Sequence, residues 1–304
     1  MNVRSITCFV NAGEPAGQAE AVNAAGHLAR QVQVALEAAG LPVQSRRLAT
    51  QPLSSLPGDP LALALALGAQ GAAAGFDYLS LGPVLAAAPG ADLERLALIP
   101  DLIRADGTTF AGILVAGRDT GINLGAIRRA AAIVREVAHT TEQGFGNLRL
   151  AVLANVGPHA PFFPAAYHDG GGPALAIALE SAGLAVDAFT PAGSLDQARA
   201  RLVAAIEEVA GRIVGAVEPL AREAGFRFAG IDFSWAPFPE EARSVGAAVE
   251  RLGVERFGTP GTLFAASLLT DCLRRARYPH CGFNGLMLPV LEDAVLAKRS
   301  KEGL

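Results

Sequence analysis

The 304-residue chain lacks the basic surface that marks nucleic-acid-binding proteins. Only two of its 25 basic residues are lysines, Lys298 and Lys301, and the formal net charge is −4. Binding to nucleic acid needs clustered Lys and Arg side chains that neutralise phosphates, and here the arginines are scattered. We therefore expect no nucleic-acid partner. The 51% content of hydrophobic residues is ample for a large core.

Cysteine is also scarce, since the chain has only Cys8, Cys272 and Cys281. Three cysteines without a CxxC pair do not make a disulfide framework, and no His-x-x-x-His spacing indicates a zinc site. The sequence thus assigns no metal ligand and no cofactor. This cysteine usage fits a reducing cytoplasm, and the start MNVRSITCFV is too short and too β-like for a signal peptide.

Long hydrophobic runs and linkers are missing as well. Residues 60–76 are uncharged, but glycines interrupt them and they fall short of the about 20 apolar residues that a membrane span requires. We interpret this stretch as a helix buried against a sheet and expect no membrane partner. Because no spacer or repeat divides the chain, we expect residues 1–304 to form one α/β domain.

Apolar, β-forming runs alternate with helical patterns along the chain. The expected strands cover residues 4–10, 43–48, 77–81, 110–116, 148–154, 185–189 and 226–233. The expected helices cover residues 20–39, 61–73, 93–104, 124–140, 173–182, 195–224, 240–252 and 263–275. Such alternation predicts a mostly parallel sheet covered by helices, with enough units to close into a barrel.

The segment NVGPHAPFFPAAYHDGGG, residues 155–172, is too irregular for a helix. Its three prolines stiffen it, because each removes a backbone donor and fixes φ. It follows the strand predicted at residues 148–154 and precedes Pro173, which suits the first position of a helix. Ligands of α/β sheets usually bind at the carboxyl ends of strands, so this segment is the leading candidate for a site.

Five side chains of this segment can bind a ligand or transfer a proton near neutral pH: Asn155, His159, Tyr167, His168 and Asp169. We expect His159 or His168 to act as the acid or base, and the other three to bind substrate. The alternative is a rigid loop that only plugs a sheet edge and leaves its histidines exposed.

A second candidate follows the last predicted strand, in GIDFSWAPFPE. Asp232 and Ser234 share one face of the strand end, because alternate residues of a strand point the same way. The Asp232 carboxylate would orient a base and Ser234 would bind substrate. In the alternative reading Asp232 caps the turn.

A third candidate is the helix start in FGTPGTL. Thr259 suits the N-cap, Pro260 the first helical position, and Gly261 and Thr262 leave backbone amides accessible. A helix start of this form can hold phosphate or carboxylate, although most helix starts hold nothing.

A fourth candidate surrounds Cys281 in YPHCGFNGLMLPVLED. A thiol beside His280 on a loop with flanking glycine can have a lowered pKa and act as a nucleophile, with Asn284 as a substrate ligand. The alternative is an inert cysteine that packs as a small hydrophobic residue.

Several of these segments together resemble the UPF0210 family, also called DUF711, of uncharacterised proteins. The matching segments, in order, are GFGNLR, PFFPAAYH, GIDFS with the following AP, FGTPGTL and GFNGLMLPVLED. The family is grouped by structure with pyruvate formate-lyase and anaerobic ribonucleotide reductase. The resemblance therefore implies an α/β barrel of two antiparallel halves, each of five parallel strands, around a central finger loop. It implies no known reaction.

The resemblance also draws attention to Cys281, since the related enzymes carry on the finger loop a cysteine that becomes a thiyl radical. Their glycyl-radical motif has no good counterpart, because the nearest match, residues 227–231, lies in mid-chain and lacks the tyrosine. We therefore expect no glycyl radical. The chain ends soon after LPVLED, where family members continue, so the barrel is expected to be incomplete at the C-terminus.

In two antiparallel half-barrels the strand ends point in opposite directions, so the candidate groups cannot all meet at one mouth. We favour a site inside the barrel built from Asn155, His159, His168, Asp232 and the Cys281 loop. Two functions remain open. One is a cytoplasmic enzyme that acts on a small polar metabolite by acid/base or thiol chemistry. The other is a non-catalytic binding or sensor protein for a small molecule, either an anion or another metabolite. A homo-oligomer is compatible with both.

Overall fold

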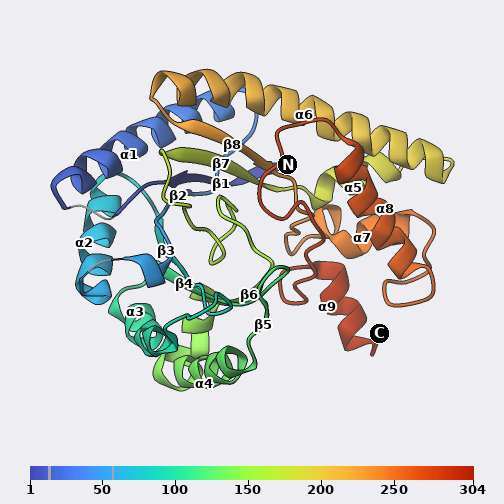
Figure 1. Cartoon of the computed structure of the whole chain (residues 1–304). Helices are drawn as coiled ribbons and strands as arrows, with labels where there is room; N and C mark the ends of the chain where they lie inside the picture. The colour runs from blue at the N-terminus through green and yellow to red at the C-terminus, as the bar shows by residue number, and fades with distance from the viewer. Residues whose placement is uncertain (13–14, 57) are drawn as a thin grey trace.

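The computed structural model describes residues 1–12, 15–56 and 58–304, and in it a mixed β-sheet curls around a central loop (Figure 1). Five strands run parallel in the order β6-β4-β3-β2-β1. Their bounds are β1 (Asn2–Phe9), β2 (Arg46–Ala49), β3 (Tyr78–Val84), β4 (Thr109–Gly117) and β6 (Leu150–Ala154). The short β5 (Gly121–Ile122) pairs antiparallel with β4. On the other side of β1 lie β7 (Ala174–Glu180), antiparallel to β1, and β8 (Arg227–Asp232), parallel to β7.

Helices cover the outer, convex side of this sheet (Figure 1). They are α1 (Pro15–Ala38), α2 (Pro60–Ala73), α3 (Ile99–Ala105), α4 (Leu124–Thr140) and α6 (Leu195–Glu223). A second group packs beyond the ends of β7 and β8: α5 (Ala182–Phe189), α7 (Val245–Arg251), α8 (Thr262–Arg275) and α9 (Ala294–Lys301). Short 3-10 helices are η1 (Leu53–Ser55), η2 (Leu93–Leu98), η3 (Glu142–Arg149) and η4 (Glu241–Arg243). Within the described ranges, no helix has both the length and the apolar composition needed to cross a membrane.

Several helices begin where the sequence supplies a capping side chain. The Asp59 carboxylate accepts a hydrogen bond from the Leu61 amide at the start of α2, and Asn123 does the same for Ala126 at the start of α4. Each cap satisfies an amide that has no partner within its helix, which explains why these two helices begin within a residue of their predicted starts at residues 61 and 124.

Strand β7 corrects two predictions. Residues 173–182 were expected to form a helix and residues 185–189 a strand, but the first stretch contains β7 and the second belongs to α5. The alternation in β7 is one of size rather than polarity. Its alanines at 174, 176 and 178 face the concave side, and Leu175, Ile177 and Leu179 join the main core. Because every residue of β7 is buried, the Ala/Leu composition mimics a buried helix.

The sheet does not close into a barrel within the described part of the chain. The path of paired strands ends at β8 on one side and at β5 and β6 on the other. A later segment, residues 280–286, lies along the free edge of β8 and the residues after it. Two isolated bridges hold it there, from Ile231 to His280 and from Trp235 to Leu286. Five parallel strands followed by two strands of opposite direction agree with the expected change of direction, but the ten-stranded barrel is not observed.

The segment between β6 and β7, residues 155–173, is called the inner loop here because it lies on the concave side of the sheet (Figure 1, yellow-green). Side-chain hydroxyls of two strands donate to its carbonyls: Ser5 and Thr7 to Pro161 at 3.2 and 3.0 Å, and Ser80 to Ala166 at 2.8 Å. The His168 amide donates to the carbonyl of Thr50, just past β2, at 2.9 Å. Three neighbouring strands thus hold the loop in place.

Candidate functional site

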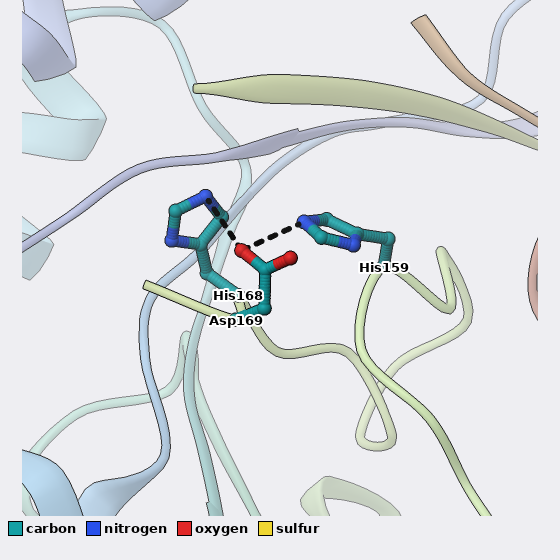
Figure 2. Close-up of side chains that lie close together, drawn as sticks. All are labelled: His159, His168 and Asp169. Carbon is teal, nitrogen blue, oxygen red and sulfur yellow. Dashed lines mark ion pairs between the residues drawn. The ribbon is translucent and has the colours of Figure 1, made fainter. Parts of the chain in front are cut away.

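Three side chains of the inner loop converge: His159, His168 and Asp169 (Figure 2). One oxygen of Asp169, Oδ1, lies 3.6 Å from Nε2 of His159 and 3.8 Å from Nε2 of His168. The two rings are nearly perpendicular, with centroids 5.4 Å apart. Both imidazoles are buried, whereas the Asp169 side chain is 46% exposed, so the cluster opens to solvent on one side.

The inner loop folds back on itself to aim His159 at this place. The His159 amide donates to the carbonyl of Tyr167 at 2.8 Å, and the Tyr167 hydroxyl donates to the carbonyl of Val156 at 2.9 Å. His159 has a left-handed backbone with φ +63°, which costs a residue with a Cβ about 1 kcal/mol or more. Tyr167 therefore shapes the loop, and the strain is concentrated at the residue that points into the cluster.

The protonation states follow from this environment. The pKa of His159 is lowered to about 4, chiefly by burial; the Asp169 carboxylate opposes this shift, and the positive charge of Arg227 and the proximity of His168 contribute to it. The pKa of Asp169 is also lowered, chiefly by a hydrogen bond from the Gly171 amide at 2.8 Å. At neutral pH the cluster therefore pairs a neutral His159 with an ionised carboxylate.

Two contacts of the cluster come from residues that the sequence did not single out as site residues. A terminal nitrogen of Arg227 lies 3.2 and 3.3 Å from the two ring nitrogens of His159, and Oδ1 of Asn11 lies 3.0 Å from Nδ1 of His168. Asn11 follows β1 and Arg227 begins β8. Ala174 of β7 pairs with Phe9 of β1 on one side and with Arg227 of β8 on the other. These pairings bring Asn11 and Arg227 to the same edge of the sheet. The position of Asn11 directly after a predicted strand could have identified it as a site residue. The sequence around Arg227 contains no pattern that would have predicted its role.

The three side chains of the cluster are spaced closely enough to serve as ligands of one metal ion, in a pattern other than the His-x-x-x-His spacing considered in the sequence. Each of the three side chains offers one ligand atom, and these atoms all lie within 4.8 Å of one another. The chemistry available is that of two imidazole nitrogens, one carboxylate and an adjacent guanidinium.

Asp232 lies at the opposite end of β8 from Arg227, about 17 Å away for five steps of a strand. It is fully buried and accepts hydrogen bonds from the amides of Ser234, Phe283 and Asn284 and from the Ser234 hydroxyl, at 2.9, 2.7, 3.1 and 2.6 Å. Burial raises its pKa, and these hydrogen bonds offset part of that effect. We call Asp232, Ser234 and the segment 283–285 the Asp232 cluster. It fastens that segment to β8.

Asn284 completes this arrangement and has no free polar atom directed at the histidines. Its Oδ1 accepts from the Phe233 amide at 2.9 Å and from the Tyr278 hydroxyl at 2.7 Å, and its Nδ2 donates to the carbonyl of Cys281 at 2.7 Å. The structure therefore places Asp232, Ser234 and Asn284 together, away from His159. They do not line the cluster of His159, His168 and Asp169 as substrate ligands.

The Cys281 thiol is not activated. Its side chain packs on the concave side against the group of Phe9 and Ala176. Burial raises its pKa well above the usual value, Asp232 adds to this and Arg227 opposes it only in part; the net shift is opposite to the lowering that a neighbouring histidine suggested. His280 stacks on the Tyr278 ring at 3.7 Å instead. A largely protonated thiol is a weak nucleophile.

The helix start at α8 differs from its prediction. The N-cap is Gly261, with φ +103° and no side-chain cap, and the helix begins at Thr262. Thr259 is not the N-cap, because its hydroxyl donates to the carbonyl of Arg256 at 2.6 Å within a preceding turn, which also places Pro260 before the helix. This turn lies in the second helix group, away from the inner loop (Figure 1).

Asn155 also lies apart from the histidines. It is exposed, has φ +55°, and lines a separate cavity of about 390 Å³ with Arg118 and Asp119 at the ends of β4 and β6. Of the sequence-based candidates, His159, His168 and Asp169 meet in one place, Tyr167 supports them, and the remaining residues belong to other parts of the molecule.

Comparison with known proteins identifies the family. The profile described as "Uncharacterised ACR (DUF711)" matches residues 1–304. A UPF0210 protein of Methanopyrus kandleri is 31% identical over 302 residues, which cover 93% of this chain and 67% of that protein. One of Pyrobaculum arsenaticum is 35% identical over 227 residues, which cover 70% and 49%, respectively. One of Desulforudis audaxviator is 30% identical over 281 residues, which cover 87% and 62%. The matches thus span about half to two thirds of these relatives, and the chain belongs to the DUF711 family of uncharacterised proteins, also named UPF0210.

Proposed function

We propose that the protein is an enzyme that acts on a small anionic metabolite at the cluster of His159, His168 and Asp169. One observation carries this proposal: two buried imidazoles share one carboxylate beside a guanidinium, on a loop whose backbone is strained at His159. Perturbed titratable groups and strained backbone are found together mainly at functional sites.

Arg227 supplies the attraction for an anion. The residue is exposed, and among the described residues it makes no ion pair with a carboxylate. A guanidinium binds carboxylates and phosphates through two parallel hydrogen bonds, so a small metabolite that carries either group suits it.

The lone pairs of the cluster supply the chemistry. A neutral imidazole next to an ionised carboxylate can take a proton from a bound substrate, or the three groups can hold a cation that polarises it. Thiol chemistry is left out of the proposal, because burial and the Asp232 carboxylate both disfavour the Cys281 thiolate.

The proposal is tested by a thermal-shift screen of the full chain against small carboxylates and phosphate esters. Each stabilising compound is then incubated with the protein and followed by mass spectrometry. We expect at least one compound to be converted, and Arg227→Gln to weaken its binding about tenfold or more through the loss of a charged hydrogen bond. Arg222→Gln, on the exposed surface of α6, is the matched control.

Two results would contradict the proposal. A stabilising compound that is recovered unchanged would make the protein a binding protein or sensor rather than an enzyme. Equal binding by the wild-type protein and Arg227→Gln would place the ligand away from the cluster.

A further inference from the structure

We infer that His159, His168 and Asp169 bind one divalent transition-metal ion, with Zn²⁺, Fe²⁺, Mn²⁺ and Co²⁺ as the chemical class. The inference rests on the site of the proposed function and deepens it, because an ion at this place would bind and polarise an anionic metabolite. Its test requires no knowledge of the metabolite.

The spacing of the ligand atoms fits one small ion. Nitrogen and oxygen ligands bind such ions at about 2.0–2.2 Å, which places two ligands of a tetrahedral site about 3.3 Å apart. Asp169 Oδ1 lies 3.6 and 3.8 Å from the two Nε2 atoms, so these contacts need to shorten by a few tenths of an ångström. All ligand atoms lie within 4.8 Å of one another, so the two imidazoles need to approach each other by at most about 1.5 Å. The atoms come from two separate turns of the inner loop, and Figure 2 shows both rings directed at the same carboxylate oxygen.

His168 can present Nε2 to an ion in one of its two tautomers. Its Nδ1 lies 3.0 Å from Oδ1 of Asn11, which can only accept, and 3.1 Å from the Gly170 amide, which can only donate. With the proton on Nε2, Nδ1 accepts from Gly170; with the proton on Nδ1, the ring donates to Asn11 and the lone pair on Nε2 is available to an ion. A bound ion would select the second tautomer, whose Nδ1–H contact is the usual second contact of a ligating histidine. The carbonyl oxygen of Gly172 lies 3.0 Å from the same Nε2. It can accept a proton from Nε2 when no ion is bound, or stand next to the ion as a further oxygen.

The donor set selects the class of ion. Two imidazole nitrogens suit first-row transition ions, whereas Mg²⁺ and Ca²⁺ prefer sites made of oxygen. Three protein ligands leave at least one position open, as in catalytic rather than structural sites, and here the exposed side of Asp169 provides the access.

Arg227 gives the inference a distinctive consequence. Its guanidinium sits 3.2–3.3 Å from both ring nitrogens of His159, so a positive charge already faces a proposed ligand. Removal of this charge should favour a metal ion and disfavour an anion. Arg227→Gln is therefore expected to bind the ion about three- to tenfold more tightly while it binds the anionic metabolite more weakly.

The test uses the full chain after removal of metals with a chelator. Co²⁺ is titrated in, with visible absorption and mass-spectrometric metal content as readouts. We expect one Co²⁺ per chain, visible bands typical of nitrogen and oxygen ligands in an open site, and displacement by Zn²⁺ but not by Mg²⁺ at the same concentration. A metal content near zero, or equal displacement by Mg²⁺, would overturn the inference.

Variants assign the ion to this place. Asp169→Asn and His168→Ala should each weaken Co²⁺ binding about 100-fold, and Asn11→Ala about tenfold through loss of the orienting contact. His139→Ala, at an exposed position on α4, is the control and should change nothing. Because Asp169 is exposed, Asp169→Asn is expected to keep the fold, which circular dichroism verifies. Unchanged binding by this variant would overturn the site. If no ion binds but Arg227→Gln still weakens metabolite binding, the proposed function stands without the metal.

Discussion

Two polar groups of residues lie at opposite ends of β8, and the sequence marks both in the same way, as ionisable side chains next to strand ends. In the Asp232 cluster every acceptor of the carboxylate meets a donor, and four hydrogen bonds fix it. In the cluster of His159, His168 and Asp169 both imidazoles approach one carboxylate oxygen at 3.6 and 3.8 Å without a short hydrogen bond to it, and the carboxylate is open to solvent. The first arrangement stabilises the fold, and the second leaves binding capacity unused.

The comparison teaches that the matching of donors with acceptors separates a structural polar group from a functional one better than burial does. Asp232 is more buried than Asp169 and belongs to the more regular part of the chain, yet it has nothing left to offer a ligand.

Asp232→Ala should lower the free energy of unfolding by about 3 kcal/mol, because it leaves several donors without a partner and frees the segment 283–285 from β8. Urea unfolding followed by circular dichroism measures the change. The exposed Asp187→Ala, on α5, serves as the control and should stay within about 0.5 kcal/mol of the wild type. A loss below about 1 kcal/mol for Asp232→Ala would mean that the Asp232 cluster is not a structural anchor.

His159→Asn should behave in the opposite way. Asparagine tolerates the left-handed backbone, so without metal the free energy of unfolding should change by less than about 1 kcal/mol. In the wild-type protein, Co²⁺ at 100 times its dissociation constant should add about 2.7 kcal/mol, and this addition should vanish in the variant. Differential scanning calorimetry with and without Co²⁺ measures both quantities. Equal stabilisation of the two proteins by Co²⁺ would exclude His159 as a ligand.

Ala176→Leu tests the packing on the concave face of β7, where Phe9 and Cys281 lie against Ala176 between the two polar clusters. A larger side chain has no room there and should lower the free energy of unfolding by about 2 kcal/mol. The neighbouring Ile177→Val, on the convex face, should reduce it by about 1 kcal/mol. Urea unfolding compares them. An Ala176→Leu protein as stable as the wild type would show that the inner loop does not pack tightly on β7.

The rate at which Cys281 is alkylated measures the reactivity of its thiol rather than the stability of the fold. Since its pKa is raised, little thiolate exists at pH 7.5, and its rate with iodoacetamide should be at least about tenfold below that in urea-unfolded protein and should still rise above pH 9. Peptide-resolved mass spectrometry from pH 5 to 10 measures this. Cys272, whose pKa burial raises to about 11, provides an internal comparison. Fast alkylation of Cys281 at pH 7 would restore the thiol to the candidate site.

Much of the fold was predictable because the first five strands and the helices between them carry ordinary polar and apolar patterns. The predicted helix at residues 124–140 matches α4 in both bounds, with Asn123 as its cap. The exchange between β7 and α5 was not foreseen, because composition dominated the interpretation of PALAIALESAG. The regular alternation of small and large residues was the available signal, and its meaning depends on the inner loop that fills the concave side.

The candidate site was predictable only as far as it is local. His159, His168 and Asp169 share one stiff segment, so the sequence could name them as a group. Asn11 is separated from His168 by 157 positions and Arg227 from His159 by 68, and only the register of β1, β7 and β8 joins them. The local bonds from Ser234 to Asp232 match the reading of Asp232 as a turn cap, but the other two donors were hidden, since they come from a segment about 50 residues away.

The hydroxyl groups of Ser5, Thr7 and Ser80 tie the inner loop to the sheet at fixed points. The loop is therefore held in place, and the His168 amide, which donates to the carbonyl of Thr50, should exchange with solvent only when this part of the sheet opens. A ligand then meets a site that is already assembled, and its rate of association is set by diffusion to the opening rather than by the closure of a lid.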